Sequence, residues 1–399
     1  MPGLDELLGS AEFQMSLLLF VALAGYLIAY GINQSAVVGI ILVGIVVGPS
    51  LLGLVTYTDF VASLARLGAV VLLFTIGLEF EFKEITQLRY GVIAMLGIIV
   101  PWVAGFGLAR AFDFGFNASV FIGTAVTATS IAITANVLDE MGKLKTPAAR
   151  AIMGAAIIDD VLALLALTVS EQLVSGSLDT ADIIMGIGKA VGFLVIAVFP
   201  LRLLVRRVML WFDVTRVARK FPQTIFIFAM MVAFLYSIGA EAAGLSAVVG
   251  SFLAGVSFAS MELHQGRVFR EGSENLRIIF ASIFFISLGV LLDVHVIDGD
   301  LLVFIVALTA VAAVSKIIGC GAPALLYGYG ARDSSIIGVG MIPRGEVAMI
   351  VALIGLSRGW IAQDTYAALV LMALLTTLIP PLLLRNWLFK RPTPVPEGP

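Results

Sequence analysis

The sequence predicts an all-α polytopic membrane protein with about thirteen transmembrane helices. Of its 399 residues, 60% are hydrophobic and only 13% are charged. Soluble domains are about 45–50% hydrophobic and about 25% charged. The apolar residues form long continuous runs, unlike the short alternating strands of an outer-membrane barrel. The formal net charge of -3 offers no basic surface for nucleic acid, and the single Cys320 excludes a disulfide framework or a cysteine-ligated zinc site.

Each expected helix corresponds to an apolar stretch of at least about 17 residues, the length that crosses a bilayer. The connections between stretches are short and leave no room for a soluble domain. The acidic N-terminus lacks the positive region of a signal peptide, and the proline-rich residues 391–399 are expected to be a disordered tail. The predicted spans are 13–31, 35–55, 60–79, 90–110, 117–138, 149–170, 182–204, 222–240, 244–261, 277–293, 301–328, 334–357 and 365–388.

The Lys and Arg residues alternate between the two ends of these spans. Eighteen of the 24 lie in the loops that precede even-numbered spans or in the C-terminal tail. Only Arg110 and Arg358 lie in the loops that follow even-numbered spans. Cytoplasmic loops are rich in Lys and Arg. The pattern therefore predicts an odd number of spans, with the N-terminus outside and the C-terminus in the cytoplasm.

Two pairs of segments repeat at nearly one offset. Residues 35–48 (SAVVGIILVGIVVG) resemble 246–259 (SAVVGSFLAGVSFA), and residues 72–81 (LLFTIGLEFE) resemble 284–293 (FFISLGVLLD). The offset corresponds to seven spans, an odd number, so the halves are expected to cross the membrane in opposite directions. Inverted repeats of this kind are typical of secondary transporters, whose sites lie near the midplane between the repeats.

Five ionisable residues fall at the centres of apolar spans: Asp159 and Asp160 in one, Lys316 in another, and Arg344 and Glu346 in a third. A charge at the bilayer centre costs about 2.5–3.5 kcal/mol or more on an isolated helix. These residues are therefore expected to face one another or a water-filled cavity. Adjacent aspartates on a helix point about 100° apart, so both can border one cavity, or one can reach a partner helix.

The aspartates have two interpretations. A carboxylate that accepts either a proton or a hard cation is the minimal part of a cation/proton exchanger, and oxygen ligands suit Na⁺ by the logic that applies to Mg²⁺ and Ca²⁺. Lys316 is the natural partner, because the pKa of a lysine shifts readily on burial. The alternative is a buried ion pair between Asp159 and Lys316 that only fixes helix packing.

Two spans are expected to be interrupted. One contains Thr127, Thr129 and Ser130 near its centre, and the other contains Pro343 among three glycines. The two stretches are related by the repeat offset, and Pro343 removes a helical N–H group. Paired interruptions in corresponding positions indicate a transporter site. The charges of Arg344 and Glu346 would offset the partial charges of the half-helix ends. The hydroxyl groups either ligate the ion or serve only in helix packing.

Three motifs carry a family resemblance: AVTATSIAITANVL (125–138), GAAIIDDVLALL (154–165) and GMIPRGEVAMIVA (340–352). In this order they resemble the monovalent cation:proton antiporters, in the branch of prokaryotic sodium/proton antiporters and Kef-type potassium efflux proteins. The resemblance covers nearly the whole chain. It implies an NhaA-like fold with two crossed, unwound helices, working by elevator-like alternating access.

The resemblance also implies residue roles and a division into domains. Asp160 matches the essential ion-binding aspartate, Asp159 the preceding acidic residue of electrogenic members, and Lys316 the lysine that pairs with it. Dimerisation helices are expected in 1–79 and 221–293, core (transport) helices in 80–173 and 294–390, and a linker helix with a basic loop in 174–220.

The resulting hypothesis is an electrogenic Na⁺/H⁺ antiporter, not an enzyme, in a prokaryotic inner membrane. Its expected partners are Na⁺, with Li⁺ or K⁺ as alternatives, together with H⁺, the lipid bilayer and a second copy in a homodimer; no cofactor and no nucleic acid are expected. The closest alternative is a K⁺/H⁺ antiporter with the same residues. A cation channel is a weaker alternative, because no TVGYG-like filter is present. An intramembrane aspartyl protease is weaker still, because the two aspartates are adjacent on one helix and no GxGD motif occurs.

Overall fold

The computed structural model describes residues 10–81, 87–176, 180–259, 261, 264, 266–292, 295 and 299–389. Residues 391–399, the expected disordered tail, lie outside this set. The described chain consists of helices joined by turns and loops, with no strand in these ranges. The first half contains α2 (Ala11–Gly31), α3 (Ala36–Val47), α4 (Asp59–Gly77), α6 (Leu88–Ala111), α7 (Phe116–Thr127), α8 (Ile131–Glu140) and α9 (Pro147–Ser175).

A linker of four helical segments follows: α10 (Thr180–Ile196), the π-helical turn η1 (Ala197–Leu201), α11 (Arg202–Asp213) and α12 (Arg216–Lys220). Pro200 lies within η1, and its missing N–H group accounts for the widened turn there. The second half contains α13 (Gln223–Ala242), α14 (Ala247–Ala259), α15 (Gly266–Val290), α16 (Gly299–Leu326), α17 (Ala331–Gly340), α18 (Glu346–Ser357), α19 (Gln363–Leu383) and η3 (Leu384–Leu388).

Local sequence signals set the ends of α9, the helix that carries both aspartates. The hydroxyl of Thr146 accepts a hydrogen bond from the N–H of Ala149 at 3.3 Å, and Pro147 occupies the first helical position. Both features favour a helix start. The helix ends at Gly176, whose φ of 75° is left-handed and suits glycine. Asp159 and Asp160 therefore lie near the middle of a helix of 29 residues.

The helices confirm a multi-pass membrane protein. In the described part of the chain, ten helical segments are long and apolar enough to cross a membrane, and three apolar helices are shorter. The predicted span 35–55 was wrong in length: α3 has 12 residues and rises about 18 Å, because Gly48 and Pro49 end it. The predicted span 277–293 started too late, since α15 begins at Gly266 with a charged segment that hydropathy does not detect.

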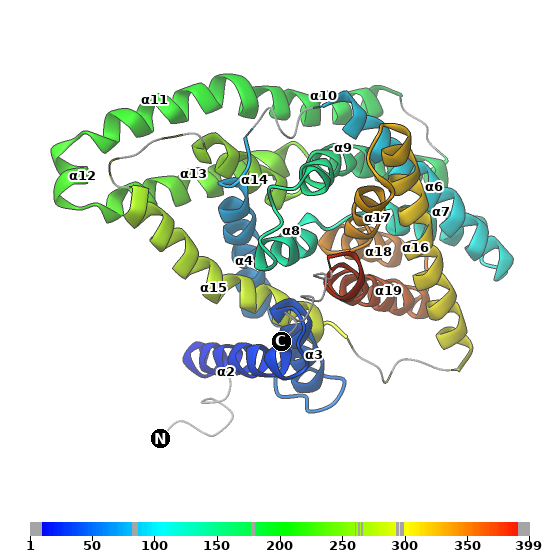
Figure 1. Ribbon diagram of the computed structural model, residues 1–399. Coiled ribbons are helices and arrows are strands. Elements are labelled where there is room, and N and C mark those ends of the chain that lie inside the picture. The colour runs from blue at the N-terminus through cyan, green and yellow to red at the C-terminus, as the bar shows by residue number, and fades with distance from the viewer. Residues whose placement is uncertain are drawn as a thin grey trace, which may run out of the picture.

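The helices pack in two groups. In the first, α4 packs against α14 and α15, and α3 packs against α2 and α15; in the second, α6 packs against α7, α9 and α16, and α18 against α7 and α19. Figure 1 shows the second group on the right, and the long α10–α11 segment along the top edge. Between the groups lies α8, which contacts α3 and α4 as well as α9. The assignment of these groups to dimerisation and transport stays a prediction.

Glycines allow the helices of the first group to approach closely. Gly77 on α4 faces Gly255 on α14, and a Cβ added to Gly77 would lie 2.3 Å from the carbonyl oxygen of Phe252. Small residues at such crossings are the usual basis of tight packing between membrane helices. The helices around α4 are therefore closely packed.

Candidate functional site

Asp159 and Lys316 form a buried ion pair between α9 and α16. Lys316 Nζ donates to Asp159 Oδ1 at 3.0 Å, and the two side chains are 0% and 1% exposed. Neither charge would be tolerated alone in this environment. The pair therefore fixes the positions of α9 and α16 relative to each other at mid-helix depth.

A glycine on a third helix makes room for this pair. A Cβ added to Gly97 of α6 would lie 2.6 Å from Cys320 Sγ, 3.6 Å from Lys316 Nζ and 3.9 Å from Asp159 Oδ1. The backbone of α6 thus covers the ion pair directly. Glycine is required at this position because any side chain would displace its neighbours.

Asp160 lies on another face of α9 and has a different environment. Its side chain is half-buried, and its Oδ2 accepts a hydrogen bond of 2.8 Å from the backbone N–H of Ser246. Ser246 directly precedes α14, so the carboxylate lies at the positive end of that helix. The angle of about 100° between successive side chains on a helix thus directs Asp159 to α16 and Asp160 to α14.

The two interrupted helices meet at their breaks. The first pair, α7 and α8, is separated by residues 128–130, and the second, α17 and α18, by residues 341–345. The N–H of Ser130 donates to the carbonyl of Pro343 at 2.8 Å, and the hydroxyl of Thr134 donates to the carbonyl of Gly340 at 2.6 Å. The predicted crossed, discontinuous helices are confirmed, and hydrogen bonds between the breaks replace those that unwinding removes.

Arg344 fills the crossing with a fully buried guanidinium group, 1% exposed. Its Nε donates to the carbonyl of Val126 at 2.9 Å, and its Nη2 donates to the carbonyl of Ala312 at 3.1 Å. Its Nη1 donates to the carbonyls of Met341 and Ile342. Val126 is in the last turn of α7, where carbonyls lack helical partners and carry partial negative charge. Arg344 thus offsets that charge.

The hydroxyl groups at the α7–α8 break differ in their partners. Thr127 donates to the carbonyl of Thr124 at 2.7 Å within α7. The hydroxyl oxygen of Thr129 is buried and has no hydrogen-bond partner among the described residues. Such orphaned polar atoms require an explanation, such as a water or an ion. Thr129 therefore has a buried hydroxyl oxygen at the break that no described residue satisfies.

Glu346 is the first residue of α18. It is therefore at a helix N-terminus, where a negative charge is favourable. Its side chain lies outside the described part of the structure, so the prediction for its carboxylate stays a prediction.

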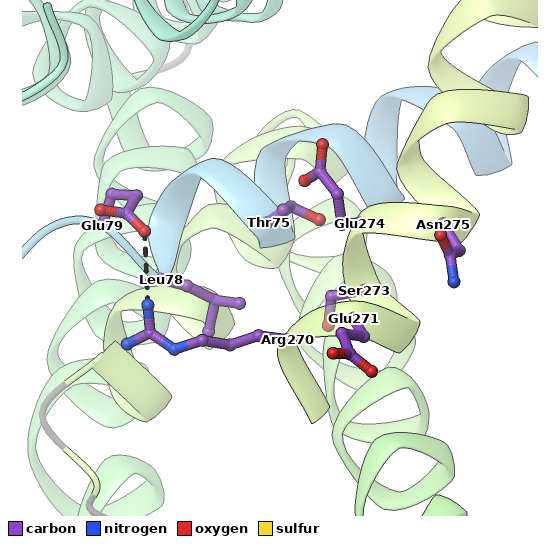
Figure 2. Close-up of a pocket in the computed structure, with 8 residues that line it drawn as sticks. All are labelled: Thr75, Leu78, Glu79, Arg270, Glu271, Ser273, Glu274 and Asn275. Carbon is purple, nitrogen blue, oxygen red and sulfur yellow. Dashed lines mark ion pairs between the residues drawn. The ribbon is translucent and has the colours of Figure 1, made fainter. Parts of the chain in front are cut away.

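A cavity lies away from these residues, where α4 ends and α15 begins. It has a volume of about 540 Å³. Figure 2 shows Arg270 pointing toward Glu79, with which it forms an ion pair of 3.8 Å, while Glu271 and Glu274 lie on α15. None of the predicted site residues lines this cavity. Its lining consists of Thr75, Leu78, Glu79, Arg270, Glu271, Ser273, Glu274 and Asn275.

Two residues of the site were not predicted. Gly97 appears in the sequence as one of many glycines in apolar spans, and only the fold shows that it faces the ion pair. Ser246 contributes through its backbone N–H, which has no signature in the amino-acid sequence. The repeated SAVVG segment, which begins at Ser246, was the one available signal that this turn is special.

Comparisons with known proteins agree with the fold and the motifs. A family model described as "Sodium/hydrogen exchanger, transmembrane" matches residues 17–390. The chain is 34% identical over 378 residues to the Na(+)/H(+)-K(+) antiporter GerN of Bacillus cereus, covering 94% of this chain and 95% of that protein. It is 33% identical over 339 residues to the high-affinity Na(+)/H(+) antiporter NhaS3 of Synechocystis, covering 82% and 71%.

Among solved structures, the sodium proton antiporter MjNhaP1 of Methanocaldococcus jannaschii is similar, with a TM-score of 0.70 and 12% sequence identity over 94% of this chain and 96% of that one. At this identity the likeness supports the fold alone. The resemblance stated from the three motifs is confirmed, because the family model and the relatives extend over nearly the whole chain. The chain belongs to the transmembrane sodium/hydrogen exchanger family.

Proposed function

We propose that the protein is an electrogenic Na⁺/H⁺ antiporter in which Na⁺ and protons compete for Asp160. The observation that carries this proposal is the contrast between adjacent aspartates: Asp159 is sealed in an ion pair with Lys316, whereas Asp160 is half-buried. A partly exposed carboxylate at the middle of a membrane helix can exchange its ligand with water. GerN and NhaS3 are named as Na⁺/H⁺ antiporters, which supports the same chemistry here.

Coupling follows from competition for one carboxylate. Asp160 carries Na⁺ when it is ionised and a proton when it is not, so that it transports one ion in each direction. Asp159 and Lys316 form a second titratable unit beside it. If Lys316 takes up a proton when Na⁺ leaves, more than one proton moves per Na⁺, and the exchange transfers net charge. Thr129, with its orphaned hydroxyl, supplies an additional oxygen ligand suited to a hard cation.

Alternating access is proposed to use the two groups of helices. In this scheme the group around α6, α9 and α16 moves against the group around α4, α14 and α15 in an elevator-like motion. Residues 80–173 and 294–390 would then form the transport domain, residues 1–79 and 221–293 the dimerisation domain, and 174–220 the linker. The homodimer, the outside N-terminus, the cytoplasmic C-terminus and the prokaryotic inner membrane belong to this proposal.

K⁺/H⁺ exchange is the second candidate, because the name of GerN includes K⁺. The test is proton flux in proteoliposomes after addition of Na⁺ or K⁺, with the membrane potential controlled. We expect Na⁺ to drive proton movement and the rate to respond to voltage. Equal stimulation by K⁺ would contradict the Na⁺ assignment, and absence of a voltage response would contradict electrogenic exchange.

The role of Asp160 is tested by Asp160→Asn, which removes the charge and keeps the shape. We expect exchange to be abolished while the thermal unfolding temperature stays close to that of the parent protein. Asp113→Asn is the matched control: Asp113 is exposed in the turn after α6 with φ of 60°, a conformation that asparagine tolerates. It should exchange normally. Exchange retained by Asp160→Asn would refute the assignment.

A further inference from the structure

The turn between α13 and α14, residues 243–246, has a defined backbone conformation. Gly244 has φ of 82°, in the left-handed region that favours glycine after a helix. Its N–H donates to the carbonyl of Glu241, and the N–H of Leu245 donates to the carbonyl of Ala240, each at 2.9 Å. The turn therefore holds the N–H of Ser246 in a fixed direction, in which it donates to Asp160 Oδ2 at 2.8 Å.

This hydrogen bond connects the two groups of helices. Asp160 is on α9, which packs against α6, α7 and α17, whereas the turn leads into α14, which packs against α4 and α13. One turn further along α9, the side chain of Leu164 lies against Gly244, where an added Cβ would be 3.0 Å from Leu164 Cδ2. Val161 and Leu164 of α9 also pack against the apolar cluster of Ala190, Ala240 and Leu245. Thus α9 docks on the α13–α14 turn through apolar contacts and one charged contact, and movement of α9 away from the turn breaks them.

The repeat-related turn makes a comparable contact. Ser35 and Ala36 begin the first SAVVG segment, and Glu140 at the end of α8 accepts a hydrogen bond from Ser35 Oγ at 2.6 Å and another from the Ala36 N–H at 3.1 Å. Each of the two short repeated helices thus has a carboxylate of α8 or α9 at its N-terminus. The difference is that Glu140 is not at mid-helix depth, whereas Asp160 is the proposed ion carrier.

We propose that the N-terminus of α14 retains the empty carrier by binding the ionised carboxylate of Asp160. A hydrogen bond to a charged acceptor is about twice as strong as one between neutral groups, and the helix dipole favours a negative charge at this position. Na⁺ or a proton on Asp160 neutralises that charge and weakens the contact, so the loaded carrier is released. An antiporter needs this difference between the empty and the loaded carrier, because return of the empty carrier would uncouple the Na⁺ and proton fluxes. The inference rests on the proposed function in assigning the ion to Asp160.

The test compares Ser246→Pro, which removes the N–H donor, with Ser246→Ala, which keeps it. Proteoliposomes are loaded with ²²Na⁺ and placed in an alkaline medium free of Na⁺ and K⁺, with equal pH on both sides and a protonophore to hold the potential near zero. Na⁺/H⁺ exchange slows as the medium is made more alkaline, because the protonated carrier becomes rare, so the net ²²Na⁺ efflux that persists at the highest pH requires return of the empty carrier. Unlabelled Na⁺ added outside measures Na⁺/Na⁺ exchange, which does not.

We expect slow net efflux from the wild-type protein, and an increase of about tenfold for Ser246→Pro, the ratio that one hydrogen bond to a charged group represents. Na⁺/Na⁺ exchange should persist in the same vesicles, and Ser246→Ala should leak far less than Ser246→Pro. Net efflux of Ser246→Pro equal to that of the wild type, with exchange intact, would overturn the inference but leave the proposed function standing. Absence of Na⁺/Na⁺ exchange in the wild-type protein would refute the proposed function, and the inference with it.

A second measurement uses the wild-type protein alone and so does not depend on folding of the proline variant. Amide hydrogen exchange of the peptide that spans residues 243–250 is compared in Na⁺-free and Na⁺-saturated protein. We expect faster exchange with Na⁺, because the Ser246 amide is released, while a peptide from α13 stays unchanged. Equal or slower exchange of the 243–250 peptide with Na⁺ would contradict the inference.

Discussion

Two ion pairs in this molecule have nearly the same geometry in opposite environments. Lys316 and Asp159 lie 3.0 Å apart and are 0% and 1% exposed, whereas Lys145 and Glu79 lie 3.2 Å apart and are 76% and 33% exposed. Breaking a buried pair by removing one partner costs about 3–5 kcal/mol, but an exposed pair contributes about 0–1 kcal/mol. Distance alone therefore says little about what a pair does, and burial decides.

The comparison also separates stability from function. Replacing a buried ion pair by well-packed apolar residues is often neutral or stabilising, so the burial of Lys316 and Asp159 is weak evidence that the pair is present for stability. The proton transfer proposed beside Asp160 would give this buried pair a use for its charge. The exposed pair of Lys145 and Glu79 does not carry this cost of burying charge.

The largest expected effect is the loss of one member of the buried pair. Lys316→Met leaves Asp159 buried without its cation, and we expect the free energy of unfolding to fall by about 3–5 kcal/mol. The double variant Lys316→Met with Asp159→Leu should recover most of this loss, while exchange is lost in both. Thermal unfolding of the detergent-solubilised proteins measures stability, and proteoliposome flux measures exchange. A double variant no more stable than Lys316→Met would contradict this account.

Much of this site could be predicted from the sequence, because charges within apolar runs are easily recognised. Asp159, Asp160, Lys316 and Arg344 stand out in this way, and the cost of burying them predicts that they find partners. Pro343 and its glycines likewise predict the interrupted helix. These signals are local, and a single sequence contains them in full.

The partners themselves could not be predicted, because they depend on long-range packing. Periodicity places the two aspartates about 100° apart but does not say that Asp160 reaches a backbone amide 86 residues away at Ser246. Nor does it say that Thr129, and not Thr127, has the hydroxyl without a partner in the described chain. Neither a backbone N–H donor nor the direction in which one of several threonine side chains points can be recognised from the sequence.

An ion pair of intermediate burial tests whether burial determines how much each pair contributes to stability. Arg277 on α15 is 16% exposed and lies 2.5 Å from Asp139 of α8 and 2.5 Å from Glu274. Arg277→Met leaves two half-buried carboxylates facing each other, and we expect a loss of about 1–3 kcal/mol, between the values for the other two pairs. Thermal unfolding measures it.

The matched control for this variant is Arg270→Met on the same helix. Arg270 is 69% exposed and lies 3.8 Å from Glu79, so its replacement should change stability by less than about 1 kcal/mol. Equal losses for Arg277→Met and Arg270→Met would show that burial does not rank these pairs.

The smallest expected effect is that of Lys145→Ala, which removes the exposed pair with Glu79. We expect a loss of stability below about 1 kcal/mol, present at low ionic strength and absent at high ionic strength. The reason is that the screening length falls from about 30 Å at about 0.01 M salt to about 3 Å at about 1 M. Unfolding temperatures should be measured in choline chloride, so that the added salt screens charge without supplying a cation that the protein transports. Lys316→Met should keep its full deficit in the same salt series, because ions in solution do not screen a pair that is sealed from water. A deficit of Lys145→Ala that persists at high salt would mean that Lys145 stabilises the protein by packing and not by charge.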